Sequence, residues 1–171
     1  MRKRFAFCGF MAGLAIAAGS GCSTARRADP AAAYRGPANA AAVVCGLTRV
    51  DPARYGGWAG ACPGTDVDAQ AFAIACESNG VSYDLMYNAQ CTAAKIEAAA
   101  AAAVSRLKPG GLLILYYSGH GGQNPDASDP SETDGKSETI CLWDGPLSDN
   151  VVWALLRKAP AGIRVWMITD S

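Results

Sequence analysis

The chain has 171 residues; half belong to the hydrophobic class, and 15 basic side chains balance 15 acidic ones. This composition suits one domain with a packed core and excludes both a disordered chain and a strongly basic nucleic-acid-binding protein. The only membrane-like segment is short and lies at the extreme N-terminus.

The N-terminal segment is typical of an export signal. Basic Arg2–Arg4 precede an apolar stretch over residues 5–18, and the run GSGC that ends at Cys22 resembles a bacterial lipobox. We expect removal of residues 1–21 and lipidation of Cys22, with ordinary signal cleavage as the alternative. Either cut leaves a slightly acidic protein without a nucleic-acid partner. We expect the protein to be exported to the cell envelope, as a membrane-anchored lipoprotein or as a periplasmic or secreted protein. Its contact with the membrane would be through the N-terminal lipid alone.

The next segment, residues 22–40, is small, contains proline and lacks apolar periodicity, which predicts a flexible tether. We place the folded domain at 41–171. It opens with an apolar run, Ala41–Leu47, followed by a helical pattern over Thr65–Ser78 and a strand pattern over Val81–Tyr87.

The same unit then repeats. Thr92 can cap a helix that runs to about Leu107, and Leu112–Tyr117 has the continuous apolar character of a central parallel strand. A long polar segment, treated as an acidic loop, leads to three further predicted elements: a short strand Ile140–Leu142, a helix Ser148–Lys158 and a strand Arg164–Thr169. Alternating strands and helices predict an α/β layered sandwich around a mostly parallel sheet.

Five cysteines remain after Cys8 and Cys22 are set aside, an odd number that cannot all pair. Their spacing does not match a zinc site. Export would permit disulfides among Cys62, Cys76 and Cys91, whereas the apolar surroundings of Cys45 and Cys76 favour buried free thiols.

Two predicted strands deliver polar residues to the same edge of the sheet. Leu112–Tyr117 runs into Ser118-Gly119-His120-Gly121-Gly122, which holds the single histidine, and the last strand runs into Asp170-Ser171. Ligands of open α/β sheets bind at this edge, so we expect a functional site there. A purely structural turn histidine is the alternative.

Several spaced motifs resemble the caspase-fold cysteine peptidases, specifically the bacterial metacaspase branch of peptidase family C14. They are CPGTDVDAQAF, YYSGHGGQ, ETICLWDG, LSDN and ITDS, which fall in order between Cys62 and Ser171. The resemblance covers residues 41–171 and implies a three-layer caspase-fold sandwich. It also implies that the catalytic cysteine follows Ser171 directly, so we expect this sequence to be an N-terminal part of the domain, incomplete at its C-terminus and inactive alone.

The resemblance assigns His120 as the catalytic acid and base, and the backbone N–H of Gly121 as an oxyanion donor. It implies that Asp68, Ser118 and Asp170 line the pocket for the residue before the scissile bond, where two carboxylates would select Arg or Lys. For Asp68, a first-turn helix acid without such a role is the alternative.

The resemblance requires no cofactor but allows calcium activation, with Asp134 and Asp149 as candidate ligands. The alternative is that Ser148 and Asp149 form an N-cap and a first-turn acid for the following helix.

Three functions follow in order of preference. The first is an exported cysteine endopeptidase that acts on peptides or proteins. The second is a caspase-like binding or regulatory module without catalysis. The third is a flavodoxin-like binder in which Gly119–Gly122 meets a phosphate, although a phosphate loop should lead directly into a helix.

Overall fold

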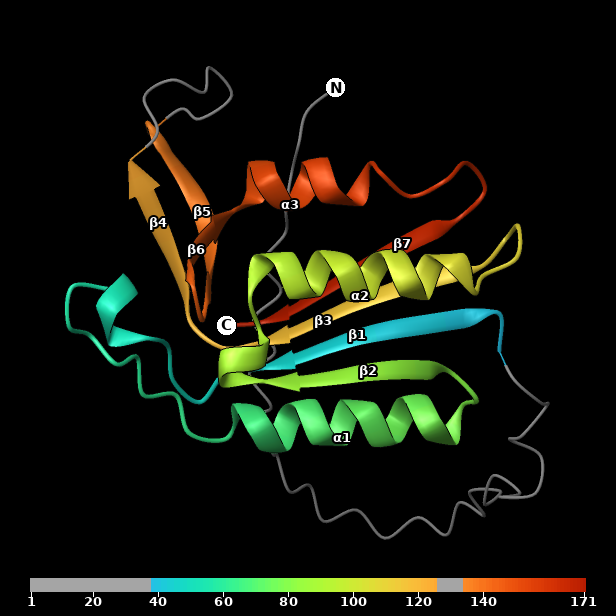
Figure 1. Cartoon of the computed structure of the whole chain (residues 1–171), viewed down its shortest axis with the longest axis horizontal. Coiled ribbons are helices and arrows are strands. Elements are labelled where there is room, and N and C mark those ends of the chain that lie inside the picture. Colours follow the sequence, from blue (N-terminus) through green and yellow to red (C-terminus); the bar gives the residue numbers. More distant parts are fainter. Residues whose placement is uncertain (1–37, 126–133) are drawn as a thin grey trace, which may run out of the picture.

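The computed structural model describes residues 38–125 and 134–171. Its centre is a four-stranded parallel sheet with the strand order β2-β1-β3-β7 (Figure 1). The strands are β1 (Ala40–Gly46), β2 (Ser82–Tyr87), β3 (Leu112–Ser118) and β7 (Arg164–Asp170). The predicted α/β fold with a parallel sheet is therefore confirmed.

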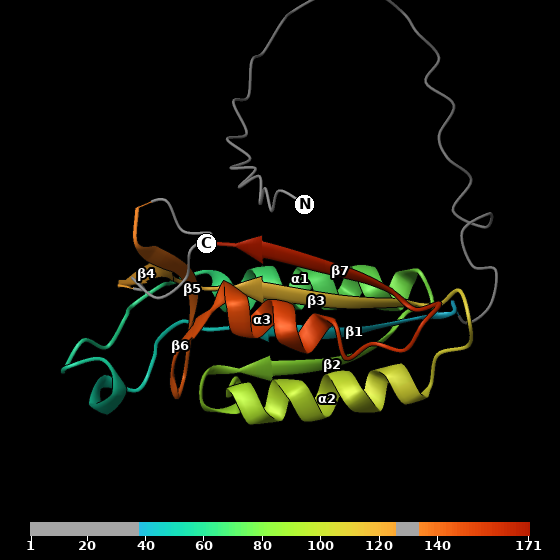
Figure 2. The same cartoon turned by 90° about the horizontal axis from the view of Figure 1, so that it is seen from above.

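Three helices cover the two faces of this sheet. They are α1 (Thr65–Ser78), α2 (Ala93–Ser105) and α3 (Asp149–Leu156). Figures 1 and 2 together show α1 on one face, and α2 and α3 on the other. Helix α1 has the bounds that the sequence predicts, and the hydroxyl of Thr92 caps α2 by accepting a hydrogen bond from the Lys95 N–H.

The burial of β1 explains this layering. Successive side chains of a strand point to opposite faces. Accordingly, Ala42 and Val44 pack in the cluster that contains α1 residues, while Val43 and Cys45 pack in the cluster that includes Ile96 of α2. A strand covered on both faces needs a continuous apolar sequence, and β1 has one.

Gly46 at the end of β1 lets α1 come close to the sheet. A Cβ at this position would lie 2.6 Å from the carbonyl oxygen of Thr65 and 2.8 Å from the Cβ of Ala69. The N-terminus of α1 therefore packs against the carboxyl end of β1, which brings the first-turn residue Asp68 to the edge where the predicted site lies.

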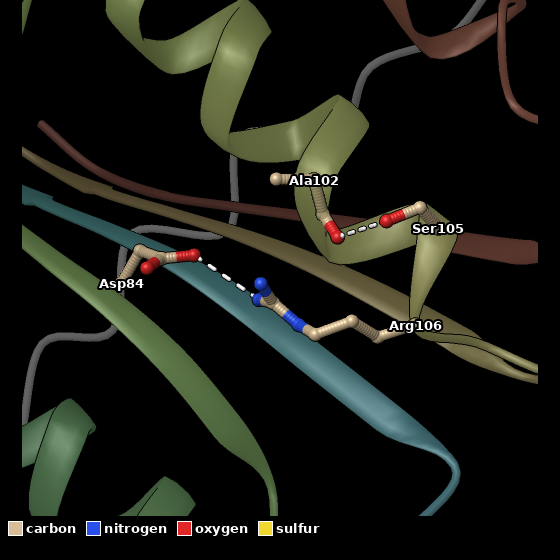
Figure 3. A network of polar contacts seen from close by, with 4 residues as sticks. All are labelled: Asp84, Ala102, Ser105 and Arg106. Carbon is tan, nitrogen blue, oxygen red and sulfur yellow. Dashed lines mark hydrogen bonds and ion pairs between the residues drawn. The ribbon is translucent and has the colours of Figure 1, made fainter.

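Two polar contacts lie at the C-terminal end of α2, and one of them joins this end to β2 (Figure 3). The guanidinium of Arg106, just after the helix, lies 3.2 Å from the carboxylate of Asp84, and the Ser105 hydroxyl donates to the carbonyl of Ala102. Both members of the ion pair are more than two-fifths exposed. Solvent therefore screens the pair, and its contribution to stability is small.

A second, antiparallel sheet stands at the carboxyl end of the first (Figure 1). It consists of β4 (Gly121–Pro125), β5 (Lys136–Leu142) and β6 (Gly145–Ser148). The predicted strand at Ile140–Leu142 is confirmed, although β5 begins earlier, at Lys136. The prediction of a loop was wrong for residues 122–125 and 136–139, which form strands, and residues 126–133 lie outside the described residues. The buried positions of β5 include Ser137 and Thr139, so its alternation is not visible as an apolar pattern.

The hydroxyl of Tyr117 ties the two sheets together. It lies 2.8 Å from the carbonyl oxygen of His120 and 2.9 Å from that of Cys141 on β5, and can donate to either. Burial, followed by the neighbouring Cys141, raises the pKa of Tyr117 well above its ordinary value. The phenol therefore remains protonated and keeps its role as a donor.

The five cysteines within the described residues are all free, and every one except the half-buried Cys62 is buried. The disulfides considered among Cys62, Cys76 and Cys91 are thus not formed, and the expectation of buried free thiols at Cys45 and Cys76 is confirmed. Within residues 38–125 and 134–171, the helices are too short or too polar to cross a membrane.

Candidate active site

The predicted site residues meet at the carboxyl edge of the parallel sheet. An open cleft of about 870 Å³ is lined by Asp68 from α1, Ser118 from β3 and Asp170 from β7, together with the turn that holds His120 and Gly121. Parallel pairing of β3 with β7 sets Ser118 opposite Asp170, which is why residues distant in sequence share one wall.

The imidazole of His120 contacts the connection between β1 and α1. Its Nε2 lies 3.2 Å from the carbonyl oxygen of Ala61. A carbonyl can only accept a hydrogen bond, so this contact selects the ring form in which Nε2 carries the proton. The ring of Trp58 lies beside the same imidazole, with 4.9 Å between the ring centroids.

The connection between β1 and α1, which carries Trp58 and Ala61, is held to the rest of the domain by several hydrogen bonds. The carboxamide oxygen of Asn88, after β2, accepts from the backbone N–H groups of Thr48 and Arg49. The hydroxyl of Tyr55 donates to the carbonyl of Leu142 at 2.7 Å. The loop that carries the partners of His120 is therefore held in place by contacts to the turn after β2 and to β5.

The end of β7 reaches the turn after β3. A Cβ built on Gly121 would lie 3.3 Å from the Oγ of Ser171, and the N–H of Gly119 donates to the carbonyl of Asp170. Gly119 is also tightly enclosed, because a Cβ there would lie 2.5 Å from the Tyr117 hydroxyl. Small residues are thus needed where the two strand ends meet.

The acidic wall is formed by Asp68 and Asp170, both exposed, around the buried Ser118. The Ser118 hydroxyl faces the Asp68 carboxylate at 3.5 Å, the long limit of a hydrogen bond. Beneath them lies Tyr116, whose ring stacks on Phe72 at 4.2 Å. Burial, then the charges of Asp170 and Asp68, raise the pKa of Tyr116 to about 12.

Sequence reasoning missed four residues near the site: Trp58, Ala61, Tyr116 and Glu138. Glu138 of β5 lines the cleft and accepts a hydrogen bond from the Gln123 side chain at 3.1 Å. Tyr116 could have been found, since it precedes Ser118 by two residues and therefore shares its face of β3. Trp58 and Ala61 lie in an irregular loop, where pattern analysis carries no signal.

The remaining predicted sites lie elsewhere. Asp134 accepts a hydrogen bond from the Lys136 N–H, and Asp149 accepts one from the Asn150 N–H in the first turn of α3, with Ser148 at the N-cap position. Among the described residues there is no group of three or more His, Cys, Asp or Glu side chains suited to a metal ion. Cys22 and residues 126–133 of the acidic segment lie outside the described residues.

Comparisons with known proteins agree with this geometry. Residues 69–171 match the family "Metacaspase, peptidase C14 domain". A Metacaspase-1 of Coccidioides immitis is 40% identical over 73 residues, which cover 40% of this chain and 16% of that protein. A Metacaspase-1 of Schizosaccharomyces pombe is also 40% identical over 73 residues, covering 40% of this chain and 17% of that protein.

A solved structure, protein GSU0716 from Geobacter sulfurreducens, superposes with a TM-score of 0.71 at 42% identity, over 77% of this chain and 50% of that one. The fold and the cleft define the class, a peptidase domain of the C14 type, and the chain belongs to its metacaspase family. It spans half of the solved relative and a much smaller part of the curated ones.

Proposed function

We propose that the full-length protein is a cysteine endopeptidase that uses His120 with a cysteine directly after Ser171. One observation carries this proposal: the end of β7 meets the turn that holds His120, where Ser171 lies against Gly121. The residue that follows Ser171 would therefore begin at the cleft. Membership of peptidase family C14 supports a thiol as the nucleophile.

In the proposed reaction, the cysteine sulfur attacks the scissile carbonyl while the imidazole of His120 takes the thiol proton. The bond to the leaving amine then breaks, and His120 returns the proton to that amine. Water, deprotonated by His120, hydrolyses the thioester and restores the thiol. The N–H of Gly121, with that of the nucleophile, would donate to the oxyanion at each tetrahedral stage.

The contact between Nε2 and the Ala61 carbonyl supports this role for the imidazole. With Nε2 as the donor to Ala61, Nδ1 is the nitrogen that accepts the thiol proton. The carbonyl dipole then faces the protonated ring, which stabilises its positive charge. A backbone carbonyl supplies the orientation that a carboxylate supplies in other hydrolases.

Among the described cysteines, Cys62 lines the cleft, whereas the other four are buried. Burial raises the pKa of Cys76 and Cys141, and the pKa of Cys45 rises through its hydrogen bond with Cys91 and through burial. These thiols are therefore poor nucleophiles. Cys62 needs a direct test, because it shares the cleft with His120.

We infer a preference for Arg or Lys before the scissile bond. The exposed carboxylates of Asp68 and Asp170 both line the cleft beside Ser118, so this wall of the cleft is negatively charged. A cationic side chain placed there would pair with both carboxylates. An aspartate would instead meet like charges.

The experiment compares full-length wild type with His120→Ala, using a peptide that ends in Arg before a reporter group. We expect the rate of hydrolysis to fall about 100- to 10,000-fold, because the proton carrier is removed. The matched control Cys62→Ser should keep wild-type activity. A catalytically inactive binding module, the second candidate, would show no hydrolysis in any variant, and loss of activity in Cys62→Ser would move the nucleophile to that residue.

Two further properties stand as proposals: export with lipidation at Cys22, and activation by calcium. For calcium, the carboxylates of Asp134 and Asp149 offer oxygen ligands of the kind that this ion prefers. A lipid at Cys22 would place peptidase activity at a membrane surface in the cell envelope, where the substrates would be exported or surface-exposed proteins.

A further inference from the structure

The indole ring of Trp58 forms the second contact of the His120 imidazole. The ring centroids lie 4.9 Å apart and the ring planes meet at 50°. We propose that Trp58 is a positioning residue. It holds the imidazole in the orientation in which Nε2 faces Ala61, and it stabilises the ring when this carries a positive charge. The inference rests on the proposed role of His120 as the proton carrier.

Trp58 is itself held from behind. The ring of Tyr55 meets it edge-on, with 5.8 Å between centroids, and the Tyr55 hydroxyl is anchored on the carbonyl of Leu142. On another side the indole packs on Gly60, where a Cβ would lie 3.1 Å from the indole ring. Gly60 has a φ of +55°, which glycine adopts without strain. Because Tyr55 and Gly60 hold the indole of Trp58 in place, the indole can restrain the His120 imidazole.

A single hydrogen bond leaves the imidazole free to tilt about its bond to Cβ. A second contact on the ring removes that freedom, and small errors in orientation cost rate in a proton transfer. The contact also acts on charge, because the π-face of indole attracts a cation within about 6 Å. It therefore favours the imidazolium that forms when the thiol is deprotonated.

A competing role for Trp58 is to contact the substrate without acting on His120, since Trp58 is 47% exposed. The two roles differ in what they affect: a substrate contact changes substrate affinity, whereas a positioning residue changes the chemical step. Other titratable groups line the same cleft and must be separated from His120 in any pH titration. They are Cys62, Asp68, Glu138 and Asp170.

The first test uses fluorescence of the full-length protein, because a protonated imidazole quenches an indole in contact with it. We expect the emission to rise as the pH is raised and the imidazole loses its proton. The transition should vanish in both Trp58→Phe and His120→Gln. It should persist in the matched control Trp166→Phe, which removes a tryptophan that is 62% exposed on β7. A full transition in Trp58→Phe or in His120→Gln would overturn the contact.

The second test separates binding from chemistry with the Arg reporter peptide. Trp58→Ala should lower kcat about 10- to 100-fold with little change in KM, and Trp58→Phe should restore most of kcat because it keeps an aromatic face. A raised KM with unchanged kcat would overturn the positioning role in favour of a substrate contact. Thermal unfolding of Trp58→Phe checks that this variant is folded.

The two proposals fail in different ways. If His120→Ala keeps wild-type hydrolysis, the proposed function is wrong, even where the fluorescence transition confirms the contact between the rings. If His120→Ala is inactive while Trp58→Ala keeps wild-type kcat, the function stands and the positioning role is wrong.

Discussion

At the scale of single residues, the acidic wall of the cleft combines two carboxylates with a serine and a tyrosine. Ser118 is buried at the end of β3 and reaches Asp68, while Tyr116 below it responds to the charges of Asp68 and Asp170. The carboxylates themselves remain exposed, so they are hydrated and open to a ligand. A guanidinium that enters the cleft would replace that water with charge-assisted hydrogen bonds.

This arrangement predicts a specificity variant. Asp170→Ala should lower kcat/KM for a peptide with Arg before the scissile bond about 10- to 100-fold, since one of the two paired carboxylates is lost. The measurement compares matched peptides that carry Arg, Lys or Asp at that position. Asp84→Ala, which removes an acid of β2 that pairs with Arg106 (Figure 3) and does not line the cleft, should leave all three values unchanged. Equal losses in both variants would argue against an acidic pocket.

The residues of this wall could be proposed from sequence because each stands at a strand end or in a helix first turn, where a motif fixes its place. His120 and Asp170 follow the two apolar runs that became β3 and β7. Trp58 and Ala61 could not be found in this way. They reach His120 across about sixty positions of sequence, and the contact of Ala61 is made by a backbone carbonyl that any residue possesses.

At the scale of elements, the approach of α1 to β1 decides where the acidic wall stands. The helix can pack at this distance because Gly46 has no side chain between β1 and the first turn of α1. The backbone of Thr65 and the side chain of Ala69 occupy the space that a Cβ would need. A larger residue would push the N-terminus of α1, and Asp68 with it, away from β3.

Gly46→Ala is therefore expected to destabilise the fold by about 1–3 kcal/mol, the usual cost of adding an atom to a closely packed core. Urea unfolding measures the change. As a control, Ala98→Ser on the exposed face of α2 should change the free energy of unfolding by less than about 0.5 kcal/mol. A Gly46→Ala variant as stable as wild type would mean that the helix shifts without cost, in which case the affinity for Arg substrates should fall instead.

Elements with strong periodicity were predictable, and those stabilised by pairing were not. Helix α1 and the four parallel strands follow apolar patterns that survive in a single sequence. Strand β4 is Gly-Gly-Gln-Asn-Pro, a composition typical of turns, and it is ordered by its antiparallel ladder with β5. A strand of this kind is specified by its partner, so its own residues give no local signal.

At the scale of the whole molecule, the proposed export segment and the described domain would have separable roles. Within the described residues, 38–125 and 134–171, β1 is the first element, and these residues form the parallel sheet, the helices and the cleft. Processing at Cys22 would therefore leave the contacts of the cleft unchanged. On the proposed function, the segment before β1 would set where the protein acts, while the cleft would set what it cuts.

Mass spectrometry of the mature protein tests this division. We expect the N-terminal peptide to begin at Cys22 with a mass increased by acyl chains, and Cys22→Ser to release the protein from membranes without altering kcat. The unchanged control is Cys8→Ser, which lies in the segment that processing would remove. A mature chain that retains Met1, or that begins at another residue without lipid, would exclude the lipoprotein.

The contact between His120 and the Ala61 carbonyl also bears on how the site tolerates mutation. The group that orients the imidazole belongs to the backbone, so it is kept when the side chain at position 61 is replaced. Most single substitutions at position 61 are therefore expected to leave the contact with His120 unchanged. Besides Trp58, the vulnerable positions lie where the path of the chain is decided, at Gly60 with its positive φ and at Asn88, which anchors the start of the loop. The orientation of the imidazole thus depends on loop shape and on the ring of Trp58, and a relative could keep it while the other side chains of that loop diverge.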